Sequence, residues 1–275
     1  MKRILNELER RDLPYTVTEM QNGSVITYAM GYAPFLYGDN QFEIDAFYLT
    51  SNKVYSLSKH LSTLSENATP SPNLNYKQIA QDTGLGTKGK NDLIFTEKFG
   101  SLCSLGAVYV EGQKENIFLD RPQIPCNVCG KCVQNCPSCA LISGFDRPNC
   151  LRQQFDSGLN EQNLPVLGKM ILGCNRCSVS CPQNKVEPIL PPKDLSDFLV
   201  ADNFFDACIK GRRAMSLLGE LIGTNYVRPA KLLTFAVYCI NNVVCDRDKW
   251  LRLLENYPDK RVQRAVSTMM NFDKK

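Results

Sequence analysis

The sequence predicts an α+β fold made of three successive segments. Over residues 1–115, short helical and strand patterns alternate, as is typical of mixed domains. Cysteines and prolines stand out between about residues 119 and 192, and only helical patterns follow Asp194. A chain of 275 residues is long enough for one to three compact units. We therefore expect domains at residues 1–118, 119–192 and 193–275.

Hydrophobic periodicity and turn residues predict the elements of the first and third segments. In the first segment we expect helices at 2–12, 53–64 and 76–83, strands at 23–30, 45–50, 93–96 and 106–110, and a loop at 67–75. In the third we expect helices at 228–244, 247–256 and 258–270, with Asp259 as an N-cap. Short paired helices of this length resemble HEAT-type packing.

The middle segment carries two cysteine motifs, C-N-V-C-G-K-C-V-Q-N-C-P and C-N-R-C-S-V-S-C-P. The first motif has the spacing of bacterial two-cluster ferredoxins, in which three cysteines hold one cluster and the fourth holds the other. It predicts two [4Fe–4S] clusters in a ferredoxin-like domain. The expected ligands are Cys126, Cys129, Cys132 and Cys181 for the first cluster, and Cys136, Cys174, Cys177 and one more cysteine for the second.

The missing ligand of the second cluster is best supplied by Cys150, which lies between the two motifs. Cys139 is nearer in sequence to Cys136, but it follows it by about one helical turn and is expected to face elsewhere. Structural zinc is the alternative for paired C-x2-C motifs, although zinc needs only four ligands and does not require the whole run.

The start of the chain, M-K-R-I-L-N-E-L-E-R-R, is too charged for the apolar core of a secretory signal. Many thiols without such a signal favour a reducing cytoplasm over disulfides. No apolar run reaches the length of a membrane span, so we expect a cytoplasmic protein with no membrane partner.

Positive charge is concentrated at the end of the chain. Residues 208–275 contain thirteen Lys and Arg against six Asp and Glu, while the whole chain has a formal net charge of +4. A basic helical region attached to a nearly neutral body indicates an anionic partner, with nucleic acid as the leading candidate. A solvated helical surface explains the same charges equally well.

A glycine-rich stretch precedes the cysteines and reads I-A-Q-D-T-G-L-G-T-K-G-K-N-D-L-I-F, with F-G-S shortly after it. It lacks the Lys-Ser/Thr ending of a nucleotide P-loop. Together with the double cysteine motif, this stretch resembles the epoxyqueuosine reductases, and more distantly the reductive dehalogenases. The resemblance covers about residues 76–272.

The resemblance implies a cobalamin cofactor on a corrinoid-binding-like first domain, an activity on a modified tRNA base in queuosine biosynthesis, and an electron donor such as ferredoxin or flavodoxin. The clusters would pass single electrons to the cobalt, and the basic helices would bind the tRNA backbone. The corrinoid-binding residues implied are Gly84, Leu85, Gly86, Thr87, Gly89 and Asn91.

Two departures from the family pattern concern catalysis. The family has an Asp proton donor fourteen residues before the first glycine, where this chain has Pro70, and its part before the clusters is usually longer. Tyr76, Lys88, Lys90 and Glu66 are possible substitutes, and the sequence selects none of them. Besides the reductase, two hypotheses stay open: an electron-transfer protein serving a corrinoid or reductase partner, and an RNA-binding module with structural clusters.

Overall fold

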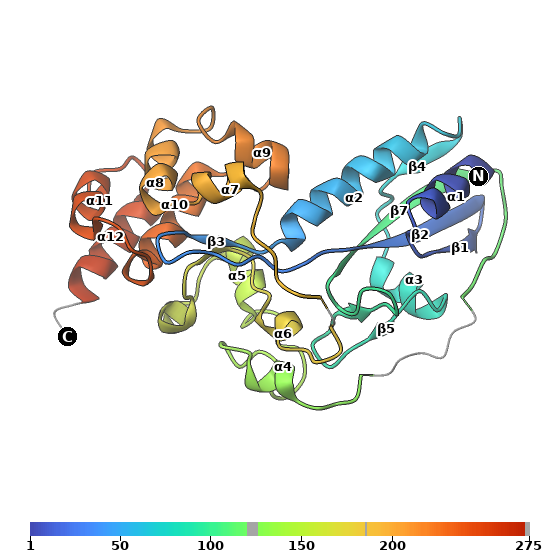
Figure 1. The fold of residues 1–275 in the computed structure, drawn as a ribbon, viewed down its shortest axis with the longest axis horizontal. Coiled ribbons are helices and arrows are strands. Elements are labelled where there is room, and N and C mark those ends of the chain that lie inside the picture. The colour runs from blue at the N-terminus through green and yellow to red at the C-terminus, as the bar shows by residue number, and fades with distance from the viewer. Residues whose placement is uncertain (120–125, 185, 273–275) are drawn as a thin grey trace. The chain divides into compact units, whose positions relative to one another are not determined.

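The computed structural model describes residues 1–119, 126–184 and 186–272, which fold into two compact units (Figure 1). Each unit is assembled from separate stretches of the chain. Unit 1 comprises Met1–Ala33, Leu49–Asn135 and Cys177–Glu187, and unit 2 comprises Pro34–Tyr48, Cys136–Arg176 and Pro188–Lys275. The expected division into domains at residues 1–118, 119–192 and 193–275 stays a prediction.

Unit 1 is built on a four-stranded antiparallel sheet with the strand order β1-β2-β7-β4. The strands are β1 (Tyr15–Met20), β2 (Gly23–Gly31), β4 (Ala68–Pro70) and β7 (Cys103–Glu111). The strands predicted at 23–30 and 106–110 are confirmed, and they pair along their full length. The loop predicted at 67–75 is wrong at Ala68–Pro70, which form strand β4. Pro70 made a strand look unfavourable there, but β4 lies at the edge of the sheet, where a proline is tolerated.

One face of this sheet is covered by the helices α1 (Lys2–Arg10) and α2 (Phe47–Ser62). Side chains at helical spacing on both helices bury against alternate residues of β2 and β7, such as Ile26 and Val108. The hydroxyl of Tyr28 donates to the carbonyl of Val54 at 2.8 Å and so ties the sheet to α2. The helices predicted at 2–12 and 53–64 are therefore confirmed.

The strand predicted at 45–50 is wrong, because helix α2 already begins at Phe47. The carboxylate of Asp45 accepts a hydrogen bond from the Phe47 N–H at 3.1 Å, and the Asp45 carbonyl accepts one from the Tyr48 N–H at 3.0 Å. An aspartate that satisfies the first free N–H groups in this way is a helix start signal. The aromatic residues after it obscured that signal in the sequence.

The opposite face of the sheet carries α3 (Tyr76–Asp82) and the small hairpin of β5 (Thr87–Lys88) and β6 (Ile94–Phe95). A separate small core joins Ala80, Leu85 and Ile94, with Leu105 of β7 packed against it. The hydroxyls of Thr16 and Thr83 are 2.9 Å apart and buried, which fixes the end of α3 on β1. The predicted helix at 76–83 and strand at 93–96 are confirmed.

Unit 2 is mainly helical and contains one short parallel pair, β3 (Glu43–Ile44) with β8 (Met170–Leu172). The helices expected beyond Asp194 are confirmed, while HEAT-type packing stays a prediction. Its helices are α5 (Leu151–Ser157), η1 (Glu161–Val166), α7 (Lys193–Phe198), α8 (Ala201–Lys210), α9 (Ser216–Ile222), α10 (Pro229–Tyr238), η2 (Ile240–Asn242), α11 (Arg247–Leu254) and α12 (Lys260–Phe272).

Aromatic side chains form much of the core of unit 2. The ring of Phe42 packs edge-on against both Phe204 and Phe205 of α8, and Phe205 stacks on Trp250 of α11. Such contacts add to the burial of large apolar area. The helix predicted at 258–270 is confirmed as α12, and four apolar residues at helical spacing along it are buried: Val262, Ala265, Val266 and Met269.

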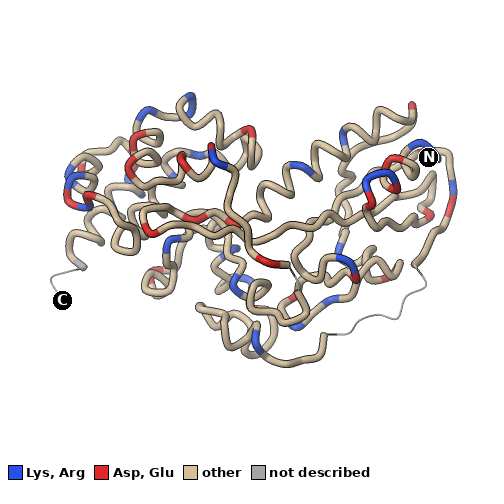
Figure 2. Tube along the Cα trace, viewed as in Figure 1, with Lys and Arg blue, Asp and Glu red and all other residues tan. Residues whose placement is uncertain are grey.

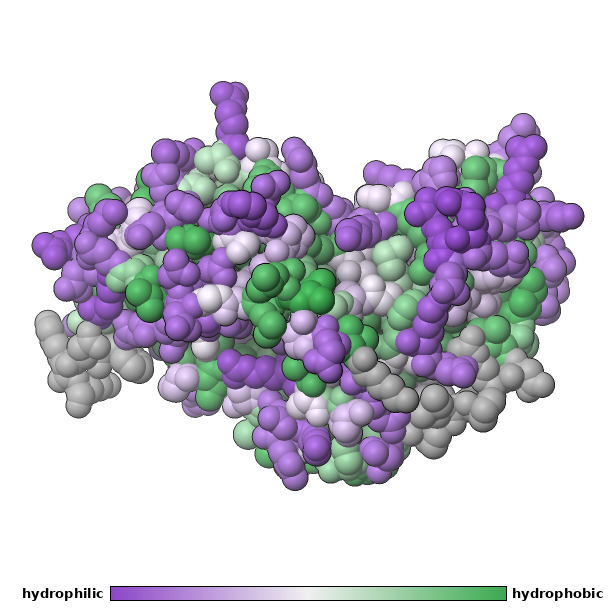
Figure 3. Space-filling view, in the orientation of Figure 1, coloured by the Kyte–Doolittle hydropathy of each residue, from purple (hydrophilic) through white to green (hydrophobic). Residues whose placement is uncertain are grey.

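The surface seen in Figure 3 is mainly hydrophilic, with small hydrophobic patches between charged and polar side chains. Within the described parts of the chain, no helix has both the length and the apolar character needed to cross a lipid bilayer.

Candidate metal centre

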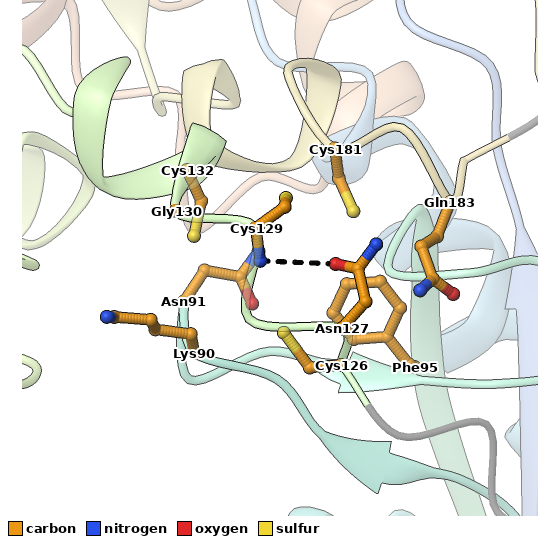
Figure 4. Close-up of a pocket in the computed structure, with 10 residues that line it drawn as sticks. All are labelled: Lys90, Asn91, Phe95, Cys126, Asn127, Cys129, Gly130, Cys132, Cys181 and Gln183. Carbon is orange, nitrogen blue, oxygen red and sulfur yellow. Dashed lines mark hydrogen bonds between the residues drawn. The ribbon is translucent and has the colours of Figure 1, made fainter.

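Four cysteines from the two motifs line one pocket within unit 1 (Figure 4). Cys126, Cys129 and Cys132 come from the first motif, and Cys181 comes from the second. The pocket thus contains the four residues predicted to hold the first cluster. A cubane takes one protein ligand per iron, so its thiolates surround it and do not converge on one point.

The loop of the first motif turns sharply before helix α4 (Lys131–Gln134). Val128 and Gly130 both have positive φ, 53° and 76°, and the side chain of Asn127 accepts a hydrogen bond from the Cys129 N–H at 3.3 Å. Positive φ is rare for a β-branched residue, so the loop conformation is strongly imposed at Val128. Turns of this kind point backbone N–H groups into a concave surface, as in many iron–sulfur sites.

The loop that carries Cys181 is held by Asn184. The Oδ1 of Asn184 accepts a hydrogen bond from the Ser101 N–H at 2.9 Å, and its Nδ2 donates to the Ser178 carbonyl at 2.5 Å. Gly100 has a φ of 57°, and a Cβ there would lie 2.1 Å from Asn184 Oδ1. The F-G-S segment therefore serves to position the second cysteine motif.

The other wall of the pocket is the β5–β6 hairpin, which contributes Lys90, Asn91 and Phe95. Asn91 is buried, with 5% of its surface exposed. Its Oδ1 accepts a hydrogen bond from the Leu93 N–H at 3.2 Å. Its Nδ2 has no hydrogen-bond partner among the described residues.

The glycines of the predicted corrinoid segment have a packing role. A Cβ on Gly86 would lie 2.5 Å from the Phe95 carbonyl, and one on Gly89 would lie 2.4 Å from the Phe95 ring. Gly84 has a φ of 76°. The N–H groups of all three glycines donate to nearby carbonyls of the chain, and Leu85 is completely buried. Thr87 is half-buried. Of the six residues predicted to bind the corrinoid, only Asn91 lines the cysteine pocket.

Three of the four cysteines predicted for the second cluster, Cys136, Cys150 and Cys174, belong to unit 2, and Cys177 belongs to unit 1. Burial is the main cause that raises the pKa of Cys174 to about 11. Arg176 acts to lower this pKa, while the thiol of Cys150 and the carboxyl of Asp45 act to raise it. The choice of Cys150 as the fourth ligand of the second cluster stays a prediction.

Cys139, the alternative to Cys150, is exposed and has a φ of 58°. Among the described residues, no group of three or more Cys, His, Asp or Glu side chains is arranged to hold a single metal ion.

Sequence reasoning missed several residues of the pocket, namely Phe95, Asn127, Gln183 and the supporting Asn184. A signal for Asn127 was present, because both motifs begin with C-N-x-C and so repeat an asparagine after the first cysteine. For the other three, no spacing or composition in the sequence distinguishes them from ordinary polar or aromatic residues.

Pro70 lies in the edge strand β4, paired with Val108 of β7. Of the four possible substitutes for the acid, Lys90 lines the cysteine pocket, while Lys88 forms an ion pair with Asp92 at 3.3 Å. The hydroxyl of Tyr76 donates to the Pro72 carbonyl at 2.5 Å, and burial raises its pKa. Glu66 is exposed.

Positions of Lys and Arg and positions of Asp and Glu are interspersed along the helices of unit 2 (Figure 2). One surface pocket gathers four cations, Arg228, Lys231, Arg261 and Arg264, here termed the basic cluster. Two acids line the same pocket: Asp156 pairs with Lys231 at 3.7 Å, and Glu161 pairs with Arg264. Burial lowers the pKa of Lys231, the carboxyl of Asp156 acts to raise it, and the nearby Arg228 and Arg261 act to lower it. Lys274 and Lys275, also counted in the basic region, lie outside the described residues.

The fold and the four-thiol pocket define a mixed α/β protein with a cysteine-rich centre. No family model matches the chain. The curated proteins it resembles are epoxyqueuosine reductases, as the motifs predicted. The enzyme of Bacillus cereus is 34% identical over 119 residues, which cover 41% of this chain and 30% of the relative. The chain thus spans about a third of the length of the curated relatives it matches.

Solved structures support the same resemblance at the level of fold. The epoxyqueuosine reductase of Bacillus subtilis, captured with its catalytic aspartate loop swung out of the active site, superposes with a TM-score of 0.72 at 15% identity. That match covers 98% of this chain and 89% of the other. An epoxyqueuosine reductase solved with an epoxyqueuosine-modified tRNA-Tyr stem loop gives a TM-score of 0.67 at 16% identity, covering 91% and 73%.

Proposed function

We propose that this chain is an iron–sulfur oxidoreductase that resembles epoxyqueuosine reductase and acts on a modified base of tRNA. The observation that carries the proposal is the pocket lined by Cys126, Cys129, Cys132 and Cys181, which joins two distant motifs. Removal of an epoxide oxygen as water takes two electrons and two protons. Two one-electron clusters in one chain suit that requirement.

The first [4Fe–4S] cluster is held by these four cysteines in this proposal. The second is held by Cys136, Cys150, Cys174 and Cys177, for which the proximity of Cys150 to Cys174 is the supporting observation. The source of electrons is a small redox protein such as ferredoxin or flavodoxin. Each cluster accepts and passes one electron at a time.

Cobalamin is part of the proposal through the resemblance. When bound, its cobalt would receive electrons from the clusters and reduce the substrate. Gly84, Leu85, Gly86, Thr87, Gly89 and Asn91 are the residues proposed to hold it. Because the N–H groups of the three glycines already donate within the chain, the segment would offer the corrinoid mainly carbonyls, side chains and a close-fitting surface.

The basic cluster is the proposed contact for the tRNA backbone. Arg228, Lys231, Arg261 and Arg264 come from two neighbouring helices and their flanking residues, and they line a common pocket. Arg and Lys that neutralise phosphates release counterions and so supply most of the sequence-independent affinity. The relative solved with a tRNA stem loop supports this choice of partner.

An electron-transfer protein without its own substrate chemistry is the second candidate. Pro70 favours it, because a proline in a paired edge strand cannot deliver the proton that an epoxide oxygen needs on opening. In that case, the clusters would be reduced and would pass their electrons to a partner protein.

One experiment separates the two candidates. The full chain is reconstituted anaerobically with iron and sulfide, supplied with cobalamin and a chemical reductant, and mixed with an RNA stem loop that carries epoxyqueuosine. A reductase will convert the RNA to a product lighter by one oxygen, and only when cobalamin is present. Reduced clusters without any product favour the electron-transfer protein. Failure of the chain to take up iron contradicts both.

A further inference from the structure

We propose that Asn91 donates a hydrogen bond from its Nδ2 to a sulfur of the first cluster and thereby raises the reduction potential of that cluster. This inference rests on the proposed function, because it requires a cluster in the pocket of Cys126, Cys129, Cys132 and Cys181. It gives Asn91 a role toward the cluster that differs from the corrinoid contact implied by the resemblance.

The first observation is the position of the side chain. Asn91 lines the cysteine pocket, and Figure 4 shows its side chain among Cys126, Cys129 and Cys132. Only 5% of its surface is exposed, so water cannot satisfy the amide freely. Its Nδ2 has no partner within the described part of the chain. A buried donor normally has an acceptor, and one that lacks it calls for an explanation such as an unseen ligand.

The second observation fixes the direction of the amide. The Leu93 N–H can only donate, so the atom of Asn91 that lies 3.2 Å from it must be the oxygen. The nitrogen therefore points away from Leu93 and carries two N–H groups that need acceptors. The pocket is lined by four cysteines and by the amides of Asn127 and Gln183, and the Asn127 Oδ1 already accepts from the Cys129 N–H. Thiolate or sulfide sulfurs are the acceptors that a bound cluster would add there.

The third observation is the rigidity of the hairpin turn that carries Asn91. The Gly89 N–H donates to the Leu93 carbonyl at 2.8 Å, and the Asp92 N–H donates to the Gly89 carbonyl at 3.0 Å. Lys77 and Lys88 both pair with Asp92, at 3.0 and 3.3 Å. A Cβ on Gly89 would lie 3.0 Å from Asn91 Oδ1, so glycine leaves the space in which the amide sits.

The chemical consequence follows from the charge of the cluster. Reduction adds one negative charge, which is spread over the sulfurs, and an N–H donor stabilises the reduced form more than the oxidised form. Hydrogen bonds to the sulfurs are among the factors that set the potentials of iron–sulfur clusters. Asn91 is therefore a positioning and tuning residue that contacts the cluster and is not a ligand of iron.

The test measures the midpoint potentials of both clusters in the reconstituted full chain, without cobalamin, by redox titration followed by EPR. In Asn91→Leu we expect one potential to become more negative, by roughly a tenfold change in the reduction equilibrium, or about 59 mV for one electron. Pulsed EPR in D₂O will show an exchangeable deuteron near one cluster of the unsubstituted protein, and this signal will be lost in the variant.

Asn91→Asp is the second variant, because it keeps the shape and the oxygen that accepts from Leu93. We expect it to lower the same potential further, since it replaces a donor by a carboxylate. If Asn91→Leu does not retain iron, Asn91→Asp decides the question. Thr27→Val is the matched control: it removes a different buried polar group without a described partner, the hydroxyl of Thr27 in β2 outside the pocket, and will leave both potentials unchanged.

Potentials that stay unchanged in Asn91→Asp, with iron content intact, overturn the inference. An Asn91 variant that keeps both potentials but binds cobalamin more weakly also overturns it and assigns the residue to the corrinoid. If the unsubstituted chain takes up no iron at all, the proposed function itself fails, and this result is distinct from a failure of the role given to Asn91.

Discussion

The side-chain oxygen of Asn184 accepts a hydrogen bond from the backbone N–H of Ser101 at 2.9 Å. This bond connects the F-G-S segment that ends the glycine-rich region to the loop of the second cysteine motif. The glycine-rich block and the end of the second cysteine motif are therefore parts of one structure in unit 1. Cys181 is positioned three residues before Asn184 on the same loop, and the Asn184 N–H donates to the Cys181 carbonyl at 3.1 Å.

Asn184→Ala will loosen the Cys181 loop, because Ser101 and Ser178 each lose a hydrogen-bond partner. Removal of one partner from a buried pair lowers the free energy of unfolding by about 1–3 kcal/mol. We expect faster loss of iron to a chelator, followed by the absorbance of the clusters. Asn203→Ala is the control, since its exposed side chain bonds only to the Asp197 carbonyl among the described residues. Equal rates of iron loss in the two variants would contradict this role.

Gly86→Ala will destabilise the chain even without cobalamin, because the added Cβ meets the Phe95 carbonyl at 2.5 Å. Overpacking of this kind lowers the free energy of unfolding by about 1–3 kcal/mol. Thermal or urea unfolding of the cobalamin-free protein measures the effect. Gly38→Ala, where a Cβ has only ordinary contacts at 3.4 Å, is the matched control. An unchanged stability in Gly86→Ala would contradict the packing role of this glycine.

Cys150→Ser will remove one cluster, and Cys139→Ser will not. Cys150 contributes to the raised pKa of Cys174 and so lies near it, whereas Cys139 is exposed. We expect the iron content to fall from about eight to about four atoms per chain in Cys150→Ser, as measured by metal analysis together with EPR. The opposite result in the two variants would assign the fourth ligand of the second cluster to Cys139.

Iron uptake by the cluster-free protein will increase with pH. Burial raises the pKa of Cys174 to about 11 and also raises that of Cys132, so both thiols are protonated at neutral pH. Because iron binds the thiolate, uptake releases these protons and is favoured as pH rises toward the raised pKa values. Competition with a chelator between about pH 7 and pH 9 measures this linkage. An iron affinity that is constant over this range would contradict it.

Arg228→Gln will weaken binding of a tRNA stem loop and will reduce the slope of log K against log salt by about one. Arg252→Gln is the control, because it removes the same charge from α11 outside the basic cluster. Fluorescence anisotropy at several salt concentrations measures both variants. Equal slopes in the two would show that net charge, and not the basic cluster, attracts the RNA.

The sequence was sufficient for those features that depend on local pattern. The β-branched run in β2 and the apolar face of α12 follow their periodicity, and the cysteine spacing led to the four residues that line the pocket. The strand β4 was missed because Pro70 is tolerated only at a sheet edge, which is a property of the tertiary structure. The start of α2 was missed because the aromatic residues after Asp45 resemble a strand.

The supporting residues could not be predicted for a different reason. The bond between Ser101 and Asn184 joins positions far apart in the chain, and no local pattern marks either residue. The unpartnered nitrogen of Asn91 becomes visible only when the burial and the hydrogen bonds of the whole hairpin are known. The glycines were interpreted as a ligand surface, and their packing against Phe95 required the structure.

The central claim is that Cys126, Cys129, Cys132 and Cys181 hold one [4Fe–4S] cluster. The most direct measurement is the iron content and EPR spectrum of the anaerobically reconstituted chain, compared with Cys181→Ser. We predict about eight iron atoms and two interacting cluster signals in the unsubstituted chain, and the loss or strong alteration of one signal in the variant. Bound zinc in place of iron, or an unchanged pair of signals in Cys181→Ser, would contradict the account.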